Sequence, residues 1–179
     1  KAIKASPHTT SSTTLFIGTE TGEIFKVTGA NSSTSPTTIN ITGSNLPSGT
    51  VSCIQVGTSE NELIATYMNY GVVSVWYTSN GGSTWINKEG NLPDMPVRWA
   101  LFNPLDNKEV LLATEVGVWG SVDFNAASPT WTPSNSGLAN VRVDMLQYRT
   151  SDNEVIAATF GRGVFSSSGF TLGATPVAN

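Results

Sequence analysis

The sequence predicts an all-β protein, specifically a β-propeller built from four-stranded antiparallel blades. The main observation is a recurrence, because Leu46, Leu92 and Leu138 are each 46 residues apart. After each leucine come an apolar strand, a polar turn and a second strand that ends near a threonine. Four short strands in a unit of about 46 residues are typical of a propeller blade. In addition, no segment shows a sustained helical period.

The first unit is predicted to hold four strands, over 1–6, 13–18, 24–28 and 37–42. A Ser- and Thr-rich loop over 29–36 separates the last two, because small polar residues and glycine favour irregular connections. The fourth strand alternates polar and apolar residues, which indicates a strand with one buried face.

The later units repeat this order. Their first strands are predicted over 51–56, 97–102 and 141–148, and their second strands over 63–66, 111–114 and 155–159. The third strand carries a bulky aromatic side chain at one place in every unit: Phe25, Trp76, Trp119 and Phe165. We interpret this column as core between blades, since large aromatic side chains dominate burial between sheets. A sugar-stacking platform is the alternative interpretation. Short fourth strands follow over 84–88 and 130–132.

The units divide the chain roughly into 1–43, 44–89, 90–135 and 136–168. The last unit is expected to stop after its third strand, and the small residues of 169–179 predict a flexible tail or linker. We favour the C-terminal piece of a larger propeller, with a closed ring of four blades as the alternative. The start at Lys1 also favours a processed or truncated chain. A β-sandwich is less favoured, because it gives no reason for the 46-residue recurrence.

Composition excludes several classes of function. The 179 residues carry a net charge of −4, and the nine basic residues are scattered, which argues against nucleic acid as a partner. No apolar run is long enough for a membrane helix. One cysteine, Cys53, and one histidine, His8, leave no support for a disulfide, a zinc site or a serine or cysteine nucleophile. We therefore expect no metal and no cofactor.

The most distinctive stretch is Thr78–Trp85, Thr-Ser-Asn-Gly-Gly-Ser-Thr-Trp. Its glycines permit positive φ, Asn80 can bond the backbone two residues on, and Trp85 supplies a large apolar anchor. The residues predict a tight hairpin turn with its own cap. Ser121-Val122-Asp123 with Thr130-Trp131 reads as a second copy that is interrupted by an insertion.

These two turns resemble the Asp-box, S-x-D-x-G-x-x-W, of the sialidase-type (BNR) β-propellers. Thr78 stands in the Ser place and Asn80 in the Asp place, while Gly82 and Trp85 match the motif. The closing segment 156–165 is similar to that of secreted bacterial members of this superfamily, which include xyloglucanase-like and sortilin-type propellers. The resemblance implies a secreted or cell-surface protein. It also implies that Thr78, Asn80, Gly82, Trp85, Asp123 and Trp131 are structural rather than catalytic.

Chemistry is therefore sought on the innermost strands. Arg98 and Arg142 follow Val97 and Val141 in matching places, and arginine suits planar recognition of carboxylates. Trp99 stands alone in its column, facing Cys53 and Val143 of other repeats, and is the better candidate for stacking on a ligand. With Arg98 and Arg142 it forms the predicted ligand site, although salt bridges and core packing are the alternative roles.

Asp144 is the best single candidate for an acid or base, because it lies in an otherwise apolar strand where desolvation raises a carboxyl pKa. Glycoside hydrolysis needs a second carboxylate across the scissile bond, and Asp94 and Glu115 are the candidates.

The sequence predicts a non-catalytic propeller segment that binds a protein or a glycan, with the rest of a parent chain as a further partner. The alternative is part of a xyloglucanase-like or sialidase-like glycoside hydrolase, with Asp144 as one acid/base carboxylate. An assembly factor that clasps a partner protein is a weaker option.

Overall fold

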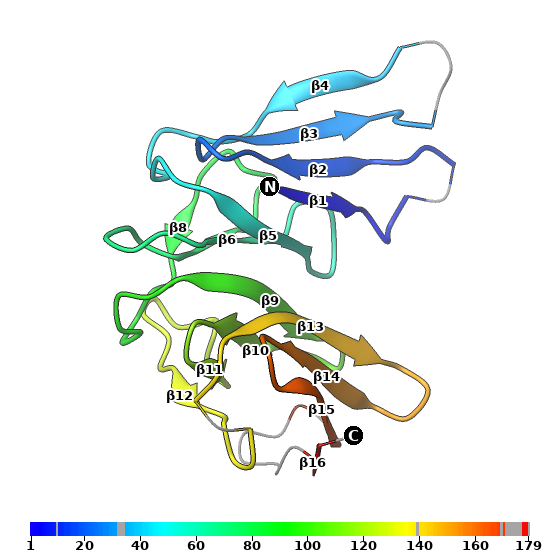
Figure 1. Cartoon of the computed structure of the whole chain (residues 1–179). Helices are drawn as coiled ribbons and strands as arrows, with labels where there is room; N and C mark the ends of the chain where they lie inside the picture. The colour runs from blue at the N-terminus through cyan, green and yellow to red at the C-terminus, as the bar shows by residue number, and fades with distance from the viewer. Residues whose placement is uncertain (10, 32–34, 139, 169, 171–176, 179) are drawn as a thin grey trace.

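The computed structural model describes residues 1–9, 11–31, 35–138, 140–168, 170 and 177–178. Its elements are sixteen strands in four four-stranded antiparallel sheets (Figure 1). This confirms the predicted all-β class and the four-stranded blade. We call the sheets blades 1 to 4 in chain order, and within each the first strand is the inner strand.

The strand bounds follow the repeat. Blade 1 contains β1 (Ala2–Ala5), β2 (Leu15–Gly18), β3 (Ile24–Thr28) and β4 (Thr37–Asn40). Blade 2 contains β5 (Val51–Val56), β6 (Leu63–Tyr67), β7 (Val75–Thr78) and β8 (Ile86–Asn87). Blade 3 contains β9 (Val97–Asn103), β10 (Asp106–Thr114), β11 (Gly117–Ser121) and β12 (Thr132–Pro133). Blade 4 contains β13 (Val143–Arg149), β14 (Glu154–Thr159), β15 (Gly163–Ser168) and β16 (Val177–Ala178).

The end of blade 4 differs from the sequence prediction, which stopped this unit after its third strand. The backbone of β16 pairs with β15, so Val177–Ala178 supplies a fourth strand. Phe170 is also buried, at 7% exposure, in the core that blade 4 shares with blade 3. The rest of the predicted 169–179 tail, and residues 32–34 of the predicted 29–36 loop, lie outside the described residues.

The blades follow one another in chain order along an arc (Figure 1). The inner strands β1, β5, β9 and β13 pack side by side in that order. Blades 1 and 4 lie at opposite ends of the arc, and Ile3 at one end and Val164 at the other are 73% and 45% exposed.

Three apolar cores lie between consecutive blades, and the second strands explain why. Strand β10 is buried on both faces, so Leu112 belongs to the core shared with blade 2 while Leu111 and Ala113 belong to the core shared with blade 4. The whole of β6 is buried for the same reason. A continuous apolar run is what a strand needs when both faces of its sheet are covered.

The aromatic column is confirmed as core between blades in blades 2 to 4. Trp76, Trp119 and Phe165 pack into the first, second and third inter-blade cores, each on the side of the preceding blade. Phe25 of blade 1 is the exception, because its register partner Ile17 pairs with the exposed Ile3. Phe25 therefore faces the open end of the arc.

The Thr78–Trp85 stretch forms the predicted capped turn, although Asn80 bonds the backbone four residues on and not two as expected. The Thr78 hydroxyl donates to the Asn80 side-chain oxygen at 2.9 Å, and the same oxygen accepts the Thr84 backbone N–H at 2.9 Å. Gly82 has φ of +89° and donates its N–H to the Thr78 hydroxyl at 3.0 Å. The Trp85 indole then donates to the Ile41 carbonyl of blade 1 at 2.8 Å.

The Ser121–Trp131 turn repeats this arrangement one blade later. The Ser121 hydroxyl donates to Asp123 at 2.7 Å, and Asp123 accepts the Thr130 N–H at 2.9 Å. These hydrogen bonds, the Ser121 hydroxyl first, lower the pKa of Asp123. The Trp131 indole donates to the Lys88 carbonyl of blade 2 at 3.0 Å. Each turn thus fastens its blade to the preceding one.

The two ends of each blade are different surfaces. The Asn80 end carries the turns from third to fourth strands, including Thr78–Trp85. The Glu115 end carries the turns from second to third strands, where Glu115 follows β10. Within the described ranges, no helix is long and apolar enough to cross a membrane.

Candidate functional site

Arg98, Arg142 and Asp144 are brought together at the Glu115 end, where blades 3 and 4 meet. Arg98 donates from Nε and Nη2 to the Glu115 carboxylate at 3.1 and 2.7 Å, and its Nε lies 3.8 Å from Asp144 Oδ1. Arg142 donates from Nε to Asp144 Oδ1 at 2.9 Å. We call these four residues the ionic cluster. It is a chain of alternating charges that joins the inner strands of two blades.

Backbone bulges explain why the side chains of Arg98 and Asp144 project from equivalent positions of their inner strands. The register of β9 against β10 shifts at Arg98, and that of β13 against β14 shifts at Asp144. A bulge puts two residues opposite one and re-aims the extra side chain, which is a recurrent device beside functional sites. The β5–β6 pair shifts in the same way at Ser52.

The bulges correct one sequence interpretation. Arg98 had been matched with Arg142, and Trp99 with Val143, whereas the strand registers place Arg98 in the position of Asp144 and Trp99 in the position of Met145. The signal was present in the sequence, because Ser52, Arg98 and Asp144 are 46 residues apart, as are the leucines. Counting from the apolar residue at the start of each strand missed it.

Ser52 is the bulge residue of blade 2, and it links blade 2 to blade 3 through an uncharged side chain. Its hydroxyl donates to the Val97 carbonyl of blade 3 at 2.6 Å and lies 2.7 Å from the Thr66 hydroxyl. Ser52 thus forms a hydrogen bond, and Arg98 an ion pair, with the blade that follows its own.

A hydrophobic element accompanies the ionic cluster. The Arg142 guanidinium carbon lies 4.0 Å from the centre of the Phe160 ring, a distance at which a cation is attracted to an aromatic face. Phe160 itself is 63% exposed. Sequence reasoning did not single out Phe160, although its place directly after the second strand, like Glu115, would have found it.

Exposed apolar side chains recur in the equivalent turns of blades 2 to 4. Tyr70, Val116 and Phe160 lie in the turns between second and third strands and are 64%, 41% and 63% exposed. We call these three residues the exposed row. Two of them adjoin the ionic cluster, because Val116 follows Glu115 in sequence and the Phe160 ring contacts Arg142. Exposed apolar side chains beside charged hydrogen-bonding groups are typical of surfaces that bind amphipathic ligands.

Asp94 is held elsewhere on the same end. Its carboxylate accepts the Gly71 N–H at 2.7 Å, in the loop that carries Tyr70. Nearby Glu89 accepts the backbone N–H groups of Ser74 and Val75. Burial raises the pKa of the Glu89 carboxyl, and the charge of Asp94 adds to this. These two carboxylates order the loop behind Tyr70.

Trp99 lies apart from the ionic cluster. Its side chain packs against the core between blades 3 and 4, together with Leu101. The indole nitrogen is buried and has no hydrogen-bond partner among the described residues. The structure therefore places Trp99 in packing between blades and not on the row of Tyr70, Val116 and Phe160.

Asp144 differs from the desolvated carboxylate that the sequence had suggested, since its side chain is 41% exposed. Asp144 and Glu115 both lie within 4 Å of Arg98 Nε. Their carboxylates are therefore close enough in principle to act as a glycosidase pair, which needs roughly 5–10 Å between them. The Arg98 guanidinium, however, contacts both of them and occupies the neighbourhood that a scissile bond would need.

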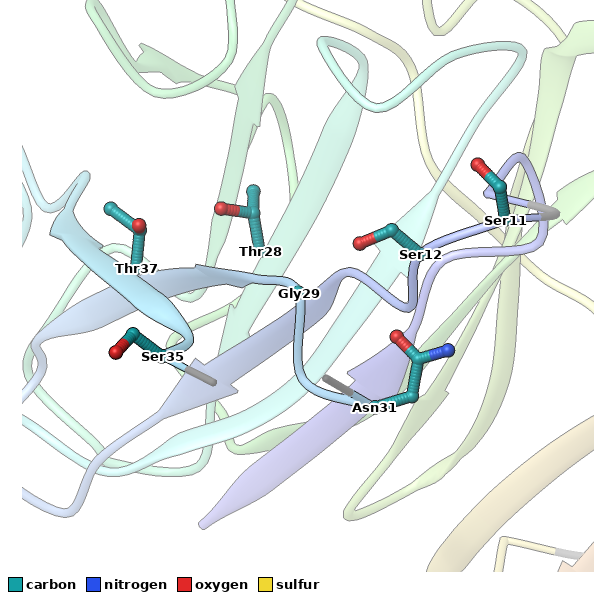
Figure 2. A pocket seen from close by; sticks show the side chains of 7 residues that line it. All are labelled: Ser11, Ser12, Thr28, Gly29, Asn31, Ser35 and Thr37. Atoms are coloured by element: carbon teal, nitrogen blue, oxygen red, sulfur yellow. The ribbon is translucent and has the colours of Figure 1, made fainter. Parts of the chain in front are cut away.

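Other parts of the described chain offer less chemistry. A hollow of about 570 Å³ on blade 1 is lined by hydroxyl and amide side chains without a titratable group, among them Ser12, Thr28 and Asn31 (Figure 2). Within the described residues, no three His, Cys, Asp or Glu side chains gather closely enough to hold a metal ion.

No protein-family model matches the sequence, and no curated protein matches it either. Solved structures do share the fold. An ancestral GH74 enzyme matches with a TM-score of 0.69 at 14% identity, over 99% of this chain and 24% of that one. The Niastella koreensis GH74 enzyme matches with a TM-score of 0.65 at 16% identity, over 98% and 29%. The GH74 xyloglucanase from Xanthomonas campestris matches with a TM-score of 0.63 at 10% identity, over 92% and 28%. This chain thus spans 24–29% of the length of these enzymes, and the likeness is one of fold.

Proposed function

We propose that this chain is a non-catalytic propeller segment of a secreted or cell-surface protein, and that its Glu115 end binds a glycan. The observation that carries the proposal is the row formed by Tyr70, Val116 and Phe160 beside the ionic cluster. The two rings offer flat apolar faces to sugar C–H groups. Arg142, Asp144 and Glu115 offer hydrogen-bond donors and acceptors for hydroxyl groups.

The turns at the Asn80 end support a structural role for the residues that resemble the Asp-box. We infer that Thr78–Trp85 and Ser121–Trp131 are two such boxes. Asn80 and Asp123 use their side-chain oxygens on backbone N–H groups of their own turns. A ligand contact at these atoms would compete with the bonds that close the turn, so we assign binding to the opposite end of the blades.

We propose binding without catalysis because both carboxylates of the ionic cluster are already paired with arginine side chains. Asp144 and Glu115 already accept hydrogen bonds from arginine side chains. A general acid has to present its proton to the leaving oxygen, and a nucleophile its free lone pair to the anomeric carbon. Both roles require an unobstructed carboxylate that faces the substrate.

The test is whether the 179-residue chain binds a soluble xyloglucan oligosaccharide, measured by calorimetry and by the chemical shifts of the Tyr and Phe rings. Tyr70→Ala and Phe160→Ala should each weaken binding by about tenfold, as one lost stacking contact costs roughly 1–1.5 kcal/mol. Leu105→Ala is the matched control, because Leu105 is 80% exposed at the Asn80 end. Unchanged affinity in both aromatic variants would remove the row as the binding surface.

Part of a glycoside hydrolase is the second candidate function, and the three GH74 structures of the same fold favour it. In that case Asp144 is one acid/base carboxylate and Glu115 is the nearest partner. Hydrolysis of xyloglucan by a longer chain containing these blades, abolished by Asp144→Asn while binding persists, would establish catalysis and overturn the non-catalytic proposal.

A further inference from the structure

Asn80–Gly81 is the only Asn–Gly pair in the 179-residue sequence. Asparagine is among the chemically labile residues of proteins. The backbone nitrogen of the residue that follows it can attack the side-chain amide carbon, and glycine, which has no Cβ, obstructs this attack least. Asn80 is also exposed, so water reaches it. The pair therefore combines the two residue types that favour this reaction with access to solvent.

The reaction needs water and no cofactor. A bond forms between the Gly81 nitrogen and Asn80 Cγ, and the bond from Cγ to Nδ2 breaks. The Nδ2 group leaves as ammonia, taking the proton of the Gly81 N–H. Water then opens the cyclic imide at either of its two carbonyl groups. The product is an aspartate in the normal backbone or an isoaspartate, in which the chain runs through the side-chain carbon.

The closed turn holds both reacting groups in other contacts. The Gly81 N–H donates to the Asn61 carbonyl at 2.9 Å, in the connection between β5 and β6. Asn80 Oδ1 accepts the Thr78 hydroxyl and the Thr84 N–H, each at 2.9 Å. Asn80 Nδ2 donates to the Thr84 hydroxyl at 2.8 Å. The side-chain amide therefore has to leave three hydrogen bonds before its carbon can approach the Gly81 nitrogen.

The Ser121–Trp131 turn shows that a carboxylate fits this arrangement. Asp123 takes the place of Asn80 there and accepts the Thr130 N–H at 2.9 Å. The Thr130 side chain also forms a hydrogen bond to Asp123. Thr84 takes the place of Thr130, and its hydroxyl can donate to a carboxylate as readily as it accepts from an amide. Aspartate at position 80 therefore keeps the turn, whereas isoaspartate lengthens the backbone within it.

We propose that Asn80 is a modification site that converts to aspartate, and that opening of the Thr78–Trp85 turn limits the rate of conversion. A slow reaction that proceeds only from a locally opened state tracks the population of that state. Conversion adds a negative charge to a chain of net charge −4, and it gives both turns that resemble the Asp-box an acidic residue. The site lies at the Asn80 end, so the inference goes beyond glycan binding at the Glu115 end and does not depend on it.

The experiment follows the 179-residue chain over time in mildly alkaline buffer, with and without guanidinium chloride. After removal of the denaturant, anion exchange measures the fraction of molecules that has gained a charge, and peptide mass spectrometry locates the change. In the unfolded chain, Asn80 should convert faster than the other asparagines. In the folded chain it should convert at least about tenfold more slowly, which corresponds to about 1.4 kcal/mol for opening the turn.

Thr84→Val tests the role of the turn, because it removes the hydroxyl that holds Asn80 Nδ2 and keeps the backbone N–H. It should raise the folded-state rate by about threefold or more, as expected for one lost hydrogen bond, and leave the unfolded-state rate unchanged. Thr130→Val is the matched control, since it makes the same change in the Ser121–Trp131 turn. It should leave both rates at Asn80 unchanged.

Four outcomes would overturn the proposal. Equal rates at Asn80 in the folded and unfolded chain, or a folded-state rate unchanged by Thr84→Val, would remove the turn as the limit. An equal rise with Thr130→Val would show that global stability sets the rate. An unfolded chain in which another asparagine converts faster would remove Asn80 as the site. Asn80→Asp should retain the circular dichroism and the urea midpoint of the wild type, and loss of the fold would contradict the fit of aspartate to the turn.

Discussion

The Trp85 indole N–H donates to the Ile41 carbonyl oxygen at 2.8 Å, across the boundary between blades 1 and 2. Both residues are buried, with 3% and 8% exposure. The bond therefore has no water to replace it. Trp131 and Lys88 repeat the relationship between blades 2 and 3.

Replacing Trp85 by Phe should lower the free energy of unfolding by about 2–3 kcal/mol, because the Ile41 carbonyl is left buried without a donor. Trp119→Phe is the control, since the Trp119 indole nitrogen has no acceptor among the described residues. It should cost at least about 1 kcal/mol less, as only packing is lost. Urea unfolding followed by fluorescence measures both, and equal costs would contradict a role for the hydrogen bond.

Replacing Gly82 by Ala should destabilise the chain by about 3 kcal/mol or more. The φ of +89° costs an L-residue roughly 1–2 kcal/mol, and crowding of a packed site adds a similar amount. A Cβ at this place would meet the Ile41 carbonyl oxygen at 2.7 Å. Gly71→Ala separates the two effects, because Gly71 has φ of +73° and no atom within 4 Å of the added Cβ. Thermal unfolding should show a clearly smaller loss for Gly71→Ala.

Glu89 predicts a specific pH dependence. Its folded-state pKa lies above the unfolded value because of burial, so the carboxyl favours the folded state at pH values below the unfolded pKa. That stability is lost as the pH rises through the folded pKa, where ionisation of the buried group opposes folding. Glu89→Gln keeps an acceptor oxygen and removes the titration.

The difference in unfolding free energy between Glu89→Gln and the wild type should therefore grow in favour of the variant from about pH 4 to pH 7. Urea titrations at several pH values measure it. A difference that stays constant, or that shrinks as pH rises, would contradict burial as the dominant influence on Glu89.

Within the ionic cluster, coupling of Arg98 to Glu115 should exceed its coupling to Asp144. Two hydrogen bonds at 2.7 and 3.1 Å join the first pair, whereas the second approaches only to 3.8 Å. Double-mutant cycles with Arg98→Met, Glu115→Gln and Asp144→Asn should give about 1 kcal/mol for the first and less for the second, because all three groups are partly exposed. A larger coupling energy for Arg98 and Asp144 would contradict this expectation and would show that Arg98 acts mainly as a link between blades 3 and 4.

The four-stranded blade could be predicted from the sequence because the fold repeats. Each structural position therefore occurs several times in the chain and can be compared between repeats. The column of Trp76, Trp119 and Phe165 and the caps at Asn80 and Asp123 depend on local pattern and turn chemistry, which a single sequence displays. The core, the turns and most strand bounds follow from them.

The candidate site was only partly predictable. Arg98 and Arg142 were predicted to share a ligand site with Trp99, and Asp144 was a separate candidate, so the ion pairs among Arg98, Arg142 and Asp144 were not foreseen. The equivalence of Arg98 and Arg142 was misjudged because a bulge changes the register without changing the apolar pattern. Trp99 was chosen as a stacking candidate because it stands alone in its column, and the sequence did not show that it packs in the core between blades 3 and 4. The partner of a side chain across two sheets depends on how the blades stack, which no local pattern records.

The order of packing has a consequence for how this chain unfolds. Among the described residues, the apolar cores join each blade to its neighbours in sequence along the arc, so these cores hold the outer blades on one side and the middle two on both. Stability in such arrays is approximately a sum over neighbouring units. Loss of structure should begin at blade 1 or blade 4 and progress inward, and amide hydrogens of β6 and β10 should exchange last.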